Sequence, residues 1–152
     1  MNERIRPPRD LEPLLDRLKE EGVFETKQKG MMFSAALGGW LNQRGEEVPE
    51  LDRRGEGIRI DYFQNVNDDG FIDAVSVTHE DALGILAPER TDHRIELFER
   101  LALLGLLHLE KALDGGLRPT LDVMVDLVEK AGEDRAPEDL PGLEDVEGVI
   151  FG

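Results

Sequence analysis

Apolar residues recur at helical spacing along most of this chain. In the first stretch they stand three, four and seven positions apart, at Leu11, Leu14, Leu15 and Leu18. That spacing predicts one apolar helix face over about residues 11–21, with Asp10 as N-cap and Gly22 as the stop.

The C-terminal half repeats the pattern twice. The longer stretch predicts a helix over about 93–114 that ends at the glycine pair 115–116. Its N-cap is Thr91 or Asp92. The shorter stretch predicts a last helix over about 119–130.

Residues 24–44, FETKQKGMMFSAALGGWLNQR, predict the central helix of the fold, over about 27–43 with Thr26 as N-cap. Apolar residues cover more than half of its circumference, which is typical of a helix buried on several sides. Its small residues, Gly38 and Gly39 among them, let another backbone come close. Core packing is the favoured reading, and a ligand pocket lined by its Met and Trp side chains is the alternative.

The middle of the chain carries the only β signal. Ile58, Ile60 and Tyr62 alternate with polar residues, the period of a half-buried strand, and the turn sequence NVNDDG follows. The pattern favours a helix over most of 71–86 and leaves open a second strand at 71–77. The prediction is a mainly α single domain of about five helices, with a short β-strand or hairpin near 58–77.

Three regions differ in composition. Residues 1–9 form an extended basic arm, because Pro7 and Pro8 exclude a helix there. Residues 10–131 form the helical domain, and the polar segment 44–57 within it is a loop with a mobile tip. Residues 132–152 form an acidic, loosely ordered tail, whose apolar end at 149–151 could instead dock on this domain or on a partner.

Charge is the dominant feature of the composition, with 34 acidic against 18 basic residues and a formal net charge of −16. The acidic residues are spread along the chain, which favours adaptation to high salt (a halophilic surface) over a single docking face. Such a surface is poor for binding phosphate backbones, which needs clustered Lys and Arg. The basic cluster in the sequence is the arm, whose Arg4, Arg6 and Arg9 could contact a phosphate or an acidic partner or serve as a solubilising tail.

The sequence lacks the residues that several kinds of catalytic and metal-binding site require. The chain has no cysteine, which excludes disulfides, thiolate zinc sites and Cys nucleophiles. The turn at 65–70 resembles a calcium loop, but Ser76 stands where a bidentate Glu is needed. The three histidines are not at metal-site spacing. We therefore predict no catalytic residue, cofactor or metal, and a cytoplasmic chain without a membrane span.

A DNA-reading helix-turn-helix over 11–43 is a weaker interpretation. Its recognition helix would have to expose polar or basic residues. Those available are at its two ends: Lys27, Gln28, Lys29, Asn42 and Gln43.

The motifs FETKQKGMMFSAALGGW, IRIDYF and RIELFERLALLGLLHLEKAL resemble the small Dnd system-associated proteins of the "protein 4" type, over roughly residues 4–115. These proteins are encoded beside DNA phosphorothioation genes in prokaryotic defence islands. The positions that fit the family pattern are Phe24, Thr26, Phe33, Ala35, Ala36, Leu37, Gly38, Trp40, Phe98, Glu99, Ala102 and Gly105. They specify a fold and bring no catalytic residues with them.

The resemblance implies a non-enzymatic accessory protein of an antiviral, restriction-like defence system, acting through contacts with other defence proteins. The alternative is a regulator that contacts DNA through the arm and helix 27–43. DNA contact is then indirect or through the arm, and a homodimer is compatible with the sequence.

Overall fold

The computed structural model describes residues 4–66, 68–80, 83–114, 116 and 118–133. The chain divides into two compact units, residues 1–114 and 115–152. The first unit contains a two-stranded antiparallel sheet and five of the six α-helices found in the described residues. The predicted mainly α fold with a small β element is confirmed.

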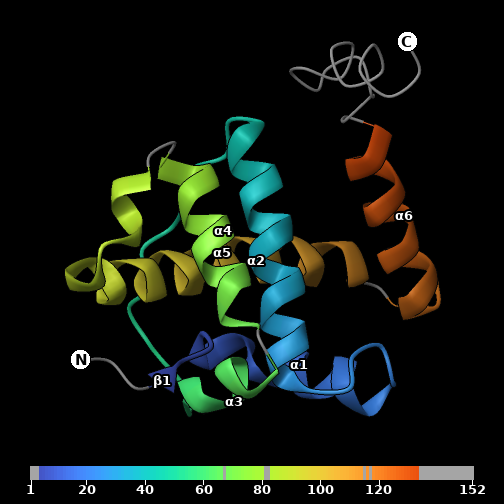
Figure 1. The fold of residues 1–152 in the computed structure, drawn as a ribbon. Helices are drawn as coiled ribbons and strands as arrows, with labels where there is room; N and C mark the ends of the chain where they lie inside the picture. The colour runs from blue at the N-terminus through green and yellow to red at the C-terminus, as the bar shows by residue number, and fades with distance from the viewer. Residues whose placement is uncertain (1–3, 67, 81–82, 115, 117, 134–152) are drawn as a thin grey trace, which may run out of the picture. The chain divides into compact units, whose positions relative to one another are not determined.

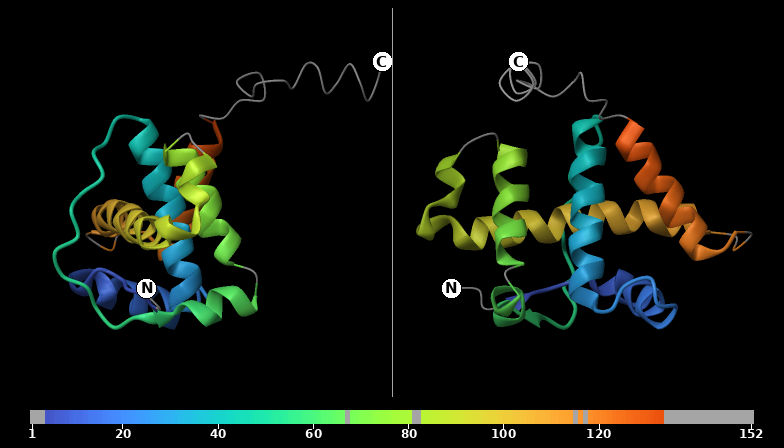
Figure 2. Two further views of the ribbon diagram at one scale, coloured as in Figure 1. Left: turned by 60° about the vertical axis from the view of Figure 1, so that its left-hand side comes forward. Right: turned by 45° about the vertical axis from the view of Figure 1, so that its right-hand side comes forward.

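The core of the first unit is the crossing of α2 (Lys27–Gln43) and α5 (Thr91–Leu113). Figures 1 and 2 show α5 running across the middle of α2. A Cβ at Gly38 would overlap the backbone carbonyl of Leu101, and one at Gly105 would overlap that of Ser34. The two backbones thus touch where each helix has a glycine, as the small residues of α2 predicted.

The start of α2 also follows the prediction. Thr26 adopts an extended backbone and its hydroxyl accepts a hydrogen bond from the Lys29 amide at 3.2 Å, which satisfies a helix-end donor. Before it, α1 (Glu12–Glu20) buries Leu14, Leu15 and Leu18.

Two predicted caps were wrong. Asp10 lies inside a 3-10 turn, Arg9–Leu11, and the N-cap position of α1 is Leu11, which makes no side-chain capping bond. The N-cap position of α5 is Arg90, so neither Thr91 nor Asp92 caps this helix. In both places a 3-10 turn leads directly into the α-helix, so the helix begins without the side-chain cap that the sequence predicted.

The predicted strand over 58–62 was wrong beyond its first two residues. Strand β2 is Ile58–Arg59, and helix α3 (Ile60–Asn65) follows at once. Helical geometry turns Phe63 fully inward, edge-on to Phe98 at 6.2 Å between ring centroids, and leaves Tyr62 57% exposed. Burial of Phe63 therefore outweighs the strand alternation that would have buried Tyr62.

The partner of β2 is the N-terminal arm. Strand β1 (Arg4–Ile5) pairs antiparallel with it, so that Arg4 faces Arg59 and Ile5 faces Ile58. Residues 71–77 lie in α4 (Asp69–Glu80), which confirms the favoured helix and excludes the hairpin. Two 3-10 turns, Leu83–Leu86 and Pro88–Arg90, then lead into α5.

Segment 44–57 returns from the far end of α2 to β2 without a helix (Figure 2). Arg100 of α5 holds it, donating to the carbonyl oxygens of Pro49 at 2.9 Å and Val48 at 3.3 Å. Leu51 is buried beneath it. The predicted loop is therefore held to α5 at residues 48–50, and again at Arg54, whose Nε lies 3.4 Å from Glu99.

The second unit contains α6 (Thr120–Glu133), which extends the predicted helix by about one turn. Most of the predicted acidic tail, with its apolar end at 149–151, lies outside the described residues. No helix in the described ranges combines the length and apolarity needed to cross a bilayer.

Candidate functional site

The N-terminal arm alternates between exposed and buried residues. Ile5 and Pro7 are buried, whereas Arg4 and Arg6 are exposed. Side chains two apart on an extended chain share a face, so the packing of Ile5 and Pro7 turns the arginines between them to solvent. The arm is thus part of the fold and not a free tail.

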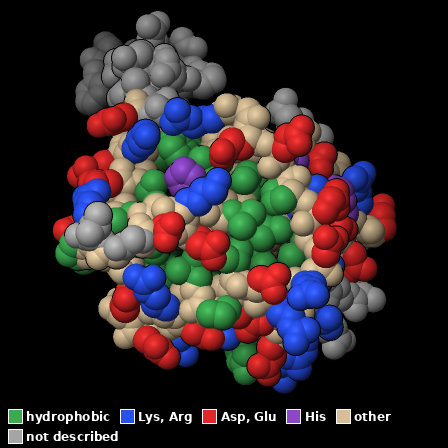
Figure 3. Space-filling view, turned by 180° about the vertical axis from the view of Figure 1, so that it is seen from behind, with side chains coloured by type: hydrophobic (Ala, Val, Ile, Leu, Met, Phe, Trp, Pro, Cys, Tyr) green, Lys and Arg blue, Asp and Glu red, His purple; other side chains and the backbone are tan. Residues whose placement is uncertain are grey.

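The opposing segment adds three more arginines. The arm and residues 53–59 run antiparallel: the Arg9 amide donates to the Arg53 carbonyl at 3.1 Å, and the Gly55 amide to the Pro7 carbonyl at 2.8 Å. We call the resulting group the arginine ladder. Its members are Arg4, Arg6 and Arg9 on the arm and Arg53, Arg54 and Arg59 on the opposing segment. Figure 3, which views the molecule from behind, shows a group of Lys and Arg side chains in blue at its lower right.

Glu99 fastens the ladder to α5. Its carboxylate is 1% exposed and accepts a hydrogen bond from the Arg6 amide at 2.6 Å, while its other oxygen lies 3.4 Å from Nε of Arg54. Burial raises the pKa of Glu99, and the contacts with Arg6 and Arg54 oppose that rise. One side chain thus holds both segments of the ladder.

The ladder arginines differ in their own ion pairs. Arg59 lies 2.7 Å from Asp61, and Arg53 lies 3.9 Å from Asp10 in a pair whose side chains are both highly exposed. Within the described residues, the guanidinium groups of Arg6 and Arg9 form no ion pair or hydrogen bond. These two are therefore the arginines with the most freedom to bind an external anion.

The basic residues at the start of α2 are already engaged. Lys27 bonds Glu12 and Asp16 at 3.3 and 3.0 Å, and these hydrogen bonds raise its pKa. Lys29 and Gln28 both donate to Asp68, at 2.9 and 2.8 Å, which lowers the pKa of that carboxyl.

The body of α2 is packed against α5, so the recognition-helix interpretation receives no support. Asp68, which lies in the calcium-like turn, is used to hold α2.

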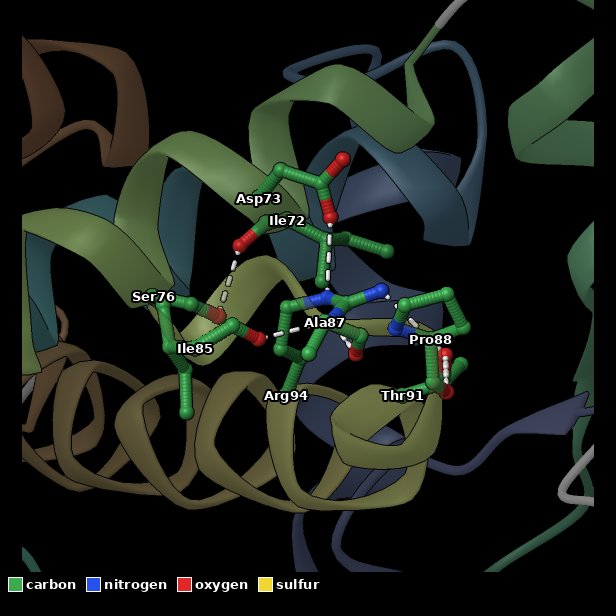
Figure 4. A network of polar contacts seen from close by, with 8 residues as sticks. All are labelled: Ile72, Asp73, Ser76, Ile85, Ala87, Pro88, Thr91 and Arg94. Atoms are coloured by element: carbon green, nitrogen blue, oxygen red, sulfur yellow. Dashed lines mark hydrogen bonds and ion pairs between the residues drawn. The ribbon is translucent and has the colours of Figure 1, made fainter. Parts of the chain in front are cut away.

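A second polar cluster surrounds Arg94 at the start of α5 (Figure 4). Its guanidinium donates to the carbonyl oxygens of Ile85 and Ala87 at 2.7 and 3.0 Å and lies 3.0 Å from Asp73. The Arg94 side chain is only 11% exposed. Its donors are used by two backbone carbonyls, the Asp73 carboxylate and the Thr91 hydroxyl, so the cluster holds α4 and the 3-10 turns onto α5.

Two of the three histidines, His93 and His79, act on the Glu80 carboxyl. His93 lies 3.0 Å from Glu80, and this contact lowers the pKa of the Glu80 carboxyl. Across the described ranges, no three His, Asp or Glu side chains are grouped so that they could hold a metal ion.

The residues that fit the family pattern are only partly in the core, because Thr26 and Ala36 are exposed and Phe24 and Phe33 are half-buried. Ala35, Gly38, Phe98, Ala102 and Gly105 are buried in or beside the α2–α5 crossing. Trp40 is partly exposed near the end of α2, with the Arg44 guanidinium 4.8 Å from its ring centroid.

The sequence predicted three of the six ladder arginines as candidate contacts: Arg4, Arg6 and Arg9. Arg53, Arg54 and Arg59 were treated as loop and strand residues, although Arg59 alternates with Ile58 and Ile60 as Arg4 and Arg6 do with Ile5.

The sequence singled out the anchor, Glu99, as a family-pattern residue, but its role in holding the arm was not predicted. Glu99 lies one residue after Phe98, on the apolar face of the α5 sequence, which is a signal of a buried carboxylate that needs a partner.

The family model described as DNA sulphur modification system-associated protein 4 matches residues 4–145. The match extends beyond the roughly 4–115 that the sequence motifs covered, into the acidic tail. No curated protein and no solved structure matches the chain.

Proposed function

Because the chain belongs to the DNA sulphur modification system-associated protein 4 family, we propose that it is a non-enzymatic accessory protein of DNA phosphorothioation-linked defence. It acts in the cytoplasm by binding other proteins of that system. The family assignment is the observation that carries the proposal, since it links the chain to this modification system.

The use of the polar groups supports a binding role over catalysis. Arg94, Asp68 and Glu99 each hold helices or strands together. In the described part of the chain, no buried side-chain nitrogen or oxygen lacks a hydrogen-bond partner. Active sites commonly keep polar groups poised for a substrate, whereas here they are committed to the fold.

The charge distribution supports charge-guided association. A net charge of −16 produces a strong field around the molecule, which speeds encounter with a basic partner surface and disfavours acidic ones. A complex that also buries apolar surface would persist when salt screens this attraction.

Affinity purification from a native host tests the proposal. The tagged full chain should co-purify with proteins encoded in the neighbouring modification genes, and the complex should survive a wash at high salt. An unrelated tagged protein of similar size and net charge is the control for carriers attracted by charge alone. If no system protein is enriched over that control, the proposal is wrong.

A further inference from the structure

We propose that the solvent face of the arginine ladder binds the phosphate backbone of nucleic acid without reading its sequence. This proposal concerns nucleic acid and goes beyond the protein contacts proposed above, and either proposal can fail without the other.

The two segments of the ladder carry a net positive formal charge, whereas the rest of the chain carries a large net negative charge. Segments 4–9 and 53–59 together contain six arginines and one acidic residue, Glu56, a formal charge of +5 in 13 residues. Since the whole chain carries −16, the other 139 residues carry −21. Asp10, Asp61 and Glu99 lie against ladder arginines and reduce this local formal charge from +5 to +2. At physiological ionic strength the Debye length is about 8 Å, so acidic side chains farther away than this do not cancel the rest.

The pairing of the strands forces like charges together. Arg4 lies directly opposite Arg59 in the ladder, and like charges in that arrangement destabilise a sheet. Asp61 compensates Arg59 in part. Arg4 also donates to the Gly57 carbonyl at 3.1 Å. An anion bound over both guanidinium groups would offset their mutual repulsion.

The backbone beneath the arginines is fixed before any ligand arrives. The Glu99 carboxylate holds the Arg6 amide and the Arg54 side chain, and the Gly55 amide bonds to the Pro7 carbonyl. A prearranged surface loses less entropy on binding than a free tail. The guanidinium groups of Arg6 and Arg9 form no ion pair or hydrogen bond with the described residues, although the charge of Arg6 acts on Glu99, and they then supply new contacts.

The chemistry favours phosphate over carboxylate partners. The ladder uses arginine throughout, and the planar guanidinium fork binds two phosphate oxygens at once. A nucleic-acid backbone also releases condensed counterions when arginines neutralise it, a gain that an isolated acidic peptide lacks. Contacts between arginine and phosphate carry no sequence information by themselves, so we expect binding that is independent of sequence.

Fluorescence anisotropy of a labelled duplex of about 20 base pairs tests the proposal. For the full chain, the logarithm of the binding constant should fall with the logarithm of salt at a slope of about −3 to −4, corresponding to three or four phosphate contacts. The double variant Arg6→Gln/Arg9→Gln should make the slope shallower by about 2 and weaken binding by roughly tenfold or more at about 50 mM salt.

The matched control is Arg44→Gln/Arg90→Gln, which removes the same charge from exposed positions outside the ladder. It should bind like the unchanged chain. Circular dichroism checks folding of each variant. If Arg6→Gln/Arg9→Gln does not fold, Arg53→Gln/Arg59→Gln tests the opposing segment, where we expect a smaller loss because both arginines already lie near carboxylates, but still a larger one than in the control.

Three results would overturn the proposal: no binding at low salt, equal loss in the control variant, or equal binding of a polyglutamate of matched charge. The last result would instead identify the ladder as a docking face for acidic proteins. Two duplexes of unrelated sequence should bind with equal affinity, and a preference of more than about tenfold would contradict the absence of sequence reading.

Discussion

Glu99 shows how one buried carboxylate connects distant parts of this chain. It lies on the inner face of α5 and bonds both the N-terminal arm and Arg54, which are 93 and 45 residues away in the sequence. Burial of a charge is costly unless hydrogen bonds and opposite charge offset it. The raised pKa of Glu99 means that burial outweighs these contacts.

This pKa leads to a prediction about pH. A carboxyl whose pKa is higher in the folded state binds a proton more readily when folded, so its contribution to stability is full at low pH and is lost as pH rises. Glu99→Gln mimics the protonated form and removes this loss.

The unfolding free energy of the unchanged chain minus that of Glu99→Gln should therefore fall as pH rises from about 4.5, the ordinary value of this carboxyl, through its folded pKa.

Urea unfolding at a series of pH values measures this difference. Asp68 and Glu80 have lowered pKa values, and they stabilise the fold above their ordinary range and lose that effect as pH falls. The unchanged chain and Glu99→Gln both contain Asp68 and Glu80, so the effects of these two groups cancel. The difference between the two unfolding free energies therefore reports on Glu99. Glu96→Gln, at an exposed position of α5, is the control and should show no such trend. A constant difference for Glu99→Gln would contradict the assignment.

At the level of elements, the α2–α5 crossing determines the architecture. Two glycines, one on each helix, bring the backbones into contact, and Ser34 beside them satisfies its hydroxyl by donating to the Gly30 carbonyl at 2.7 Å. Among the family-pattern residues, Gly38 and Gly105 are the two that permit this close approach.

The crossing predicts a sharp contrast between adjacent glycines. Gly38→Ala and Gly105→Ala would each push a methyl group into a backbone carbonyl of the other helix, which cannot rotate away. Each should lower the unfolding free energy by about 1–3 kcal/mol or more.

Gly39→Ala is the matched control, since a Cβ there meets no atom within 4 Å. It should raise stability by up to about 1 kcal/mol through helix propensity. Thermal or urea unfolding measures all three variants. Similar effects of Gly38→Ala and Gly39→Ala would show that the helices are not in contact at this point.

At the scale of the whole molecule, the excess of acidic residues opposes folding through self-repulsion. The formal charge of −16 is spread over the sequence and is relieved only locally by ion pairs such as Lys29–Asp68. Salt weakens repulsion between exposed charges, because the Debye length falls from about 10 Å at 0.1 M to about 3 Å at 1 M.

The melting temperature should therefore rise with salt at neutral pH. Between about 0.1 M and about 1 M NaCl we expect an increase of at least about 4 °C, equivalent to roughly 1 kcal/mol for a chain of this size. The same chain near its isoelectric point, about 4.5, is the control, since the net repulsion there is small and the increase should shrink. A melting temperature that does not change with salt at neutral pH would argue against a surface adapted to high salt.

The sequence by itself determined the helices and much of their burial. Lys27 and Gln43 bound α2 as predicted, Thr26 caps it, and the leucines of α1 face inward. These features follow from the period of apolar residues and from hydrogen bonds between neighbours in sequence, which act over a few residues.

Only the tertiary structure decided the partner of β2, the conformation of residues 60–65 and the membership of the arginine ladder. Ile58–Arg59 pairs with an arm more than fifty residues away, and Phe63 turns inward because Phe98 is there to meet it. Periodicity states which side of an element is apolar but not which surface covers it. The sequence thus predicted Arg4, Arg6 and Arg9 as a candidate site, and the fold placed Arg53, Arg54 and Arg59 beside them and Glu99 beneath.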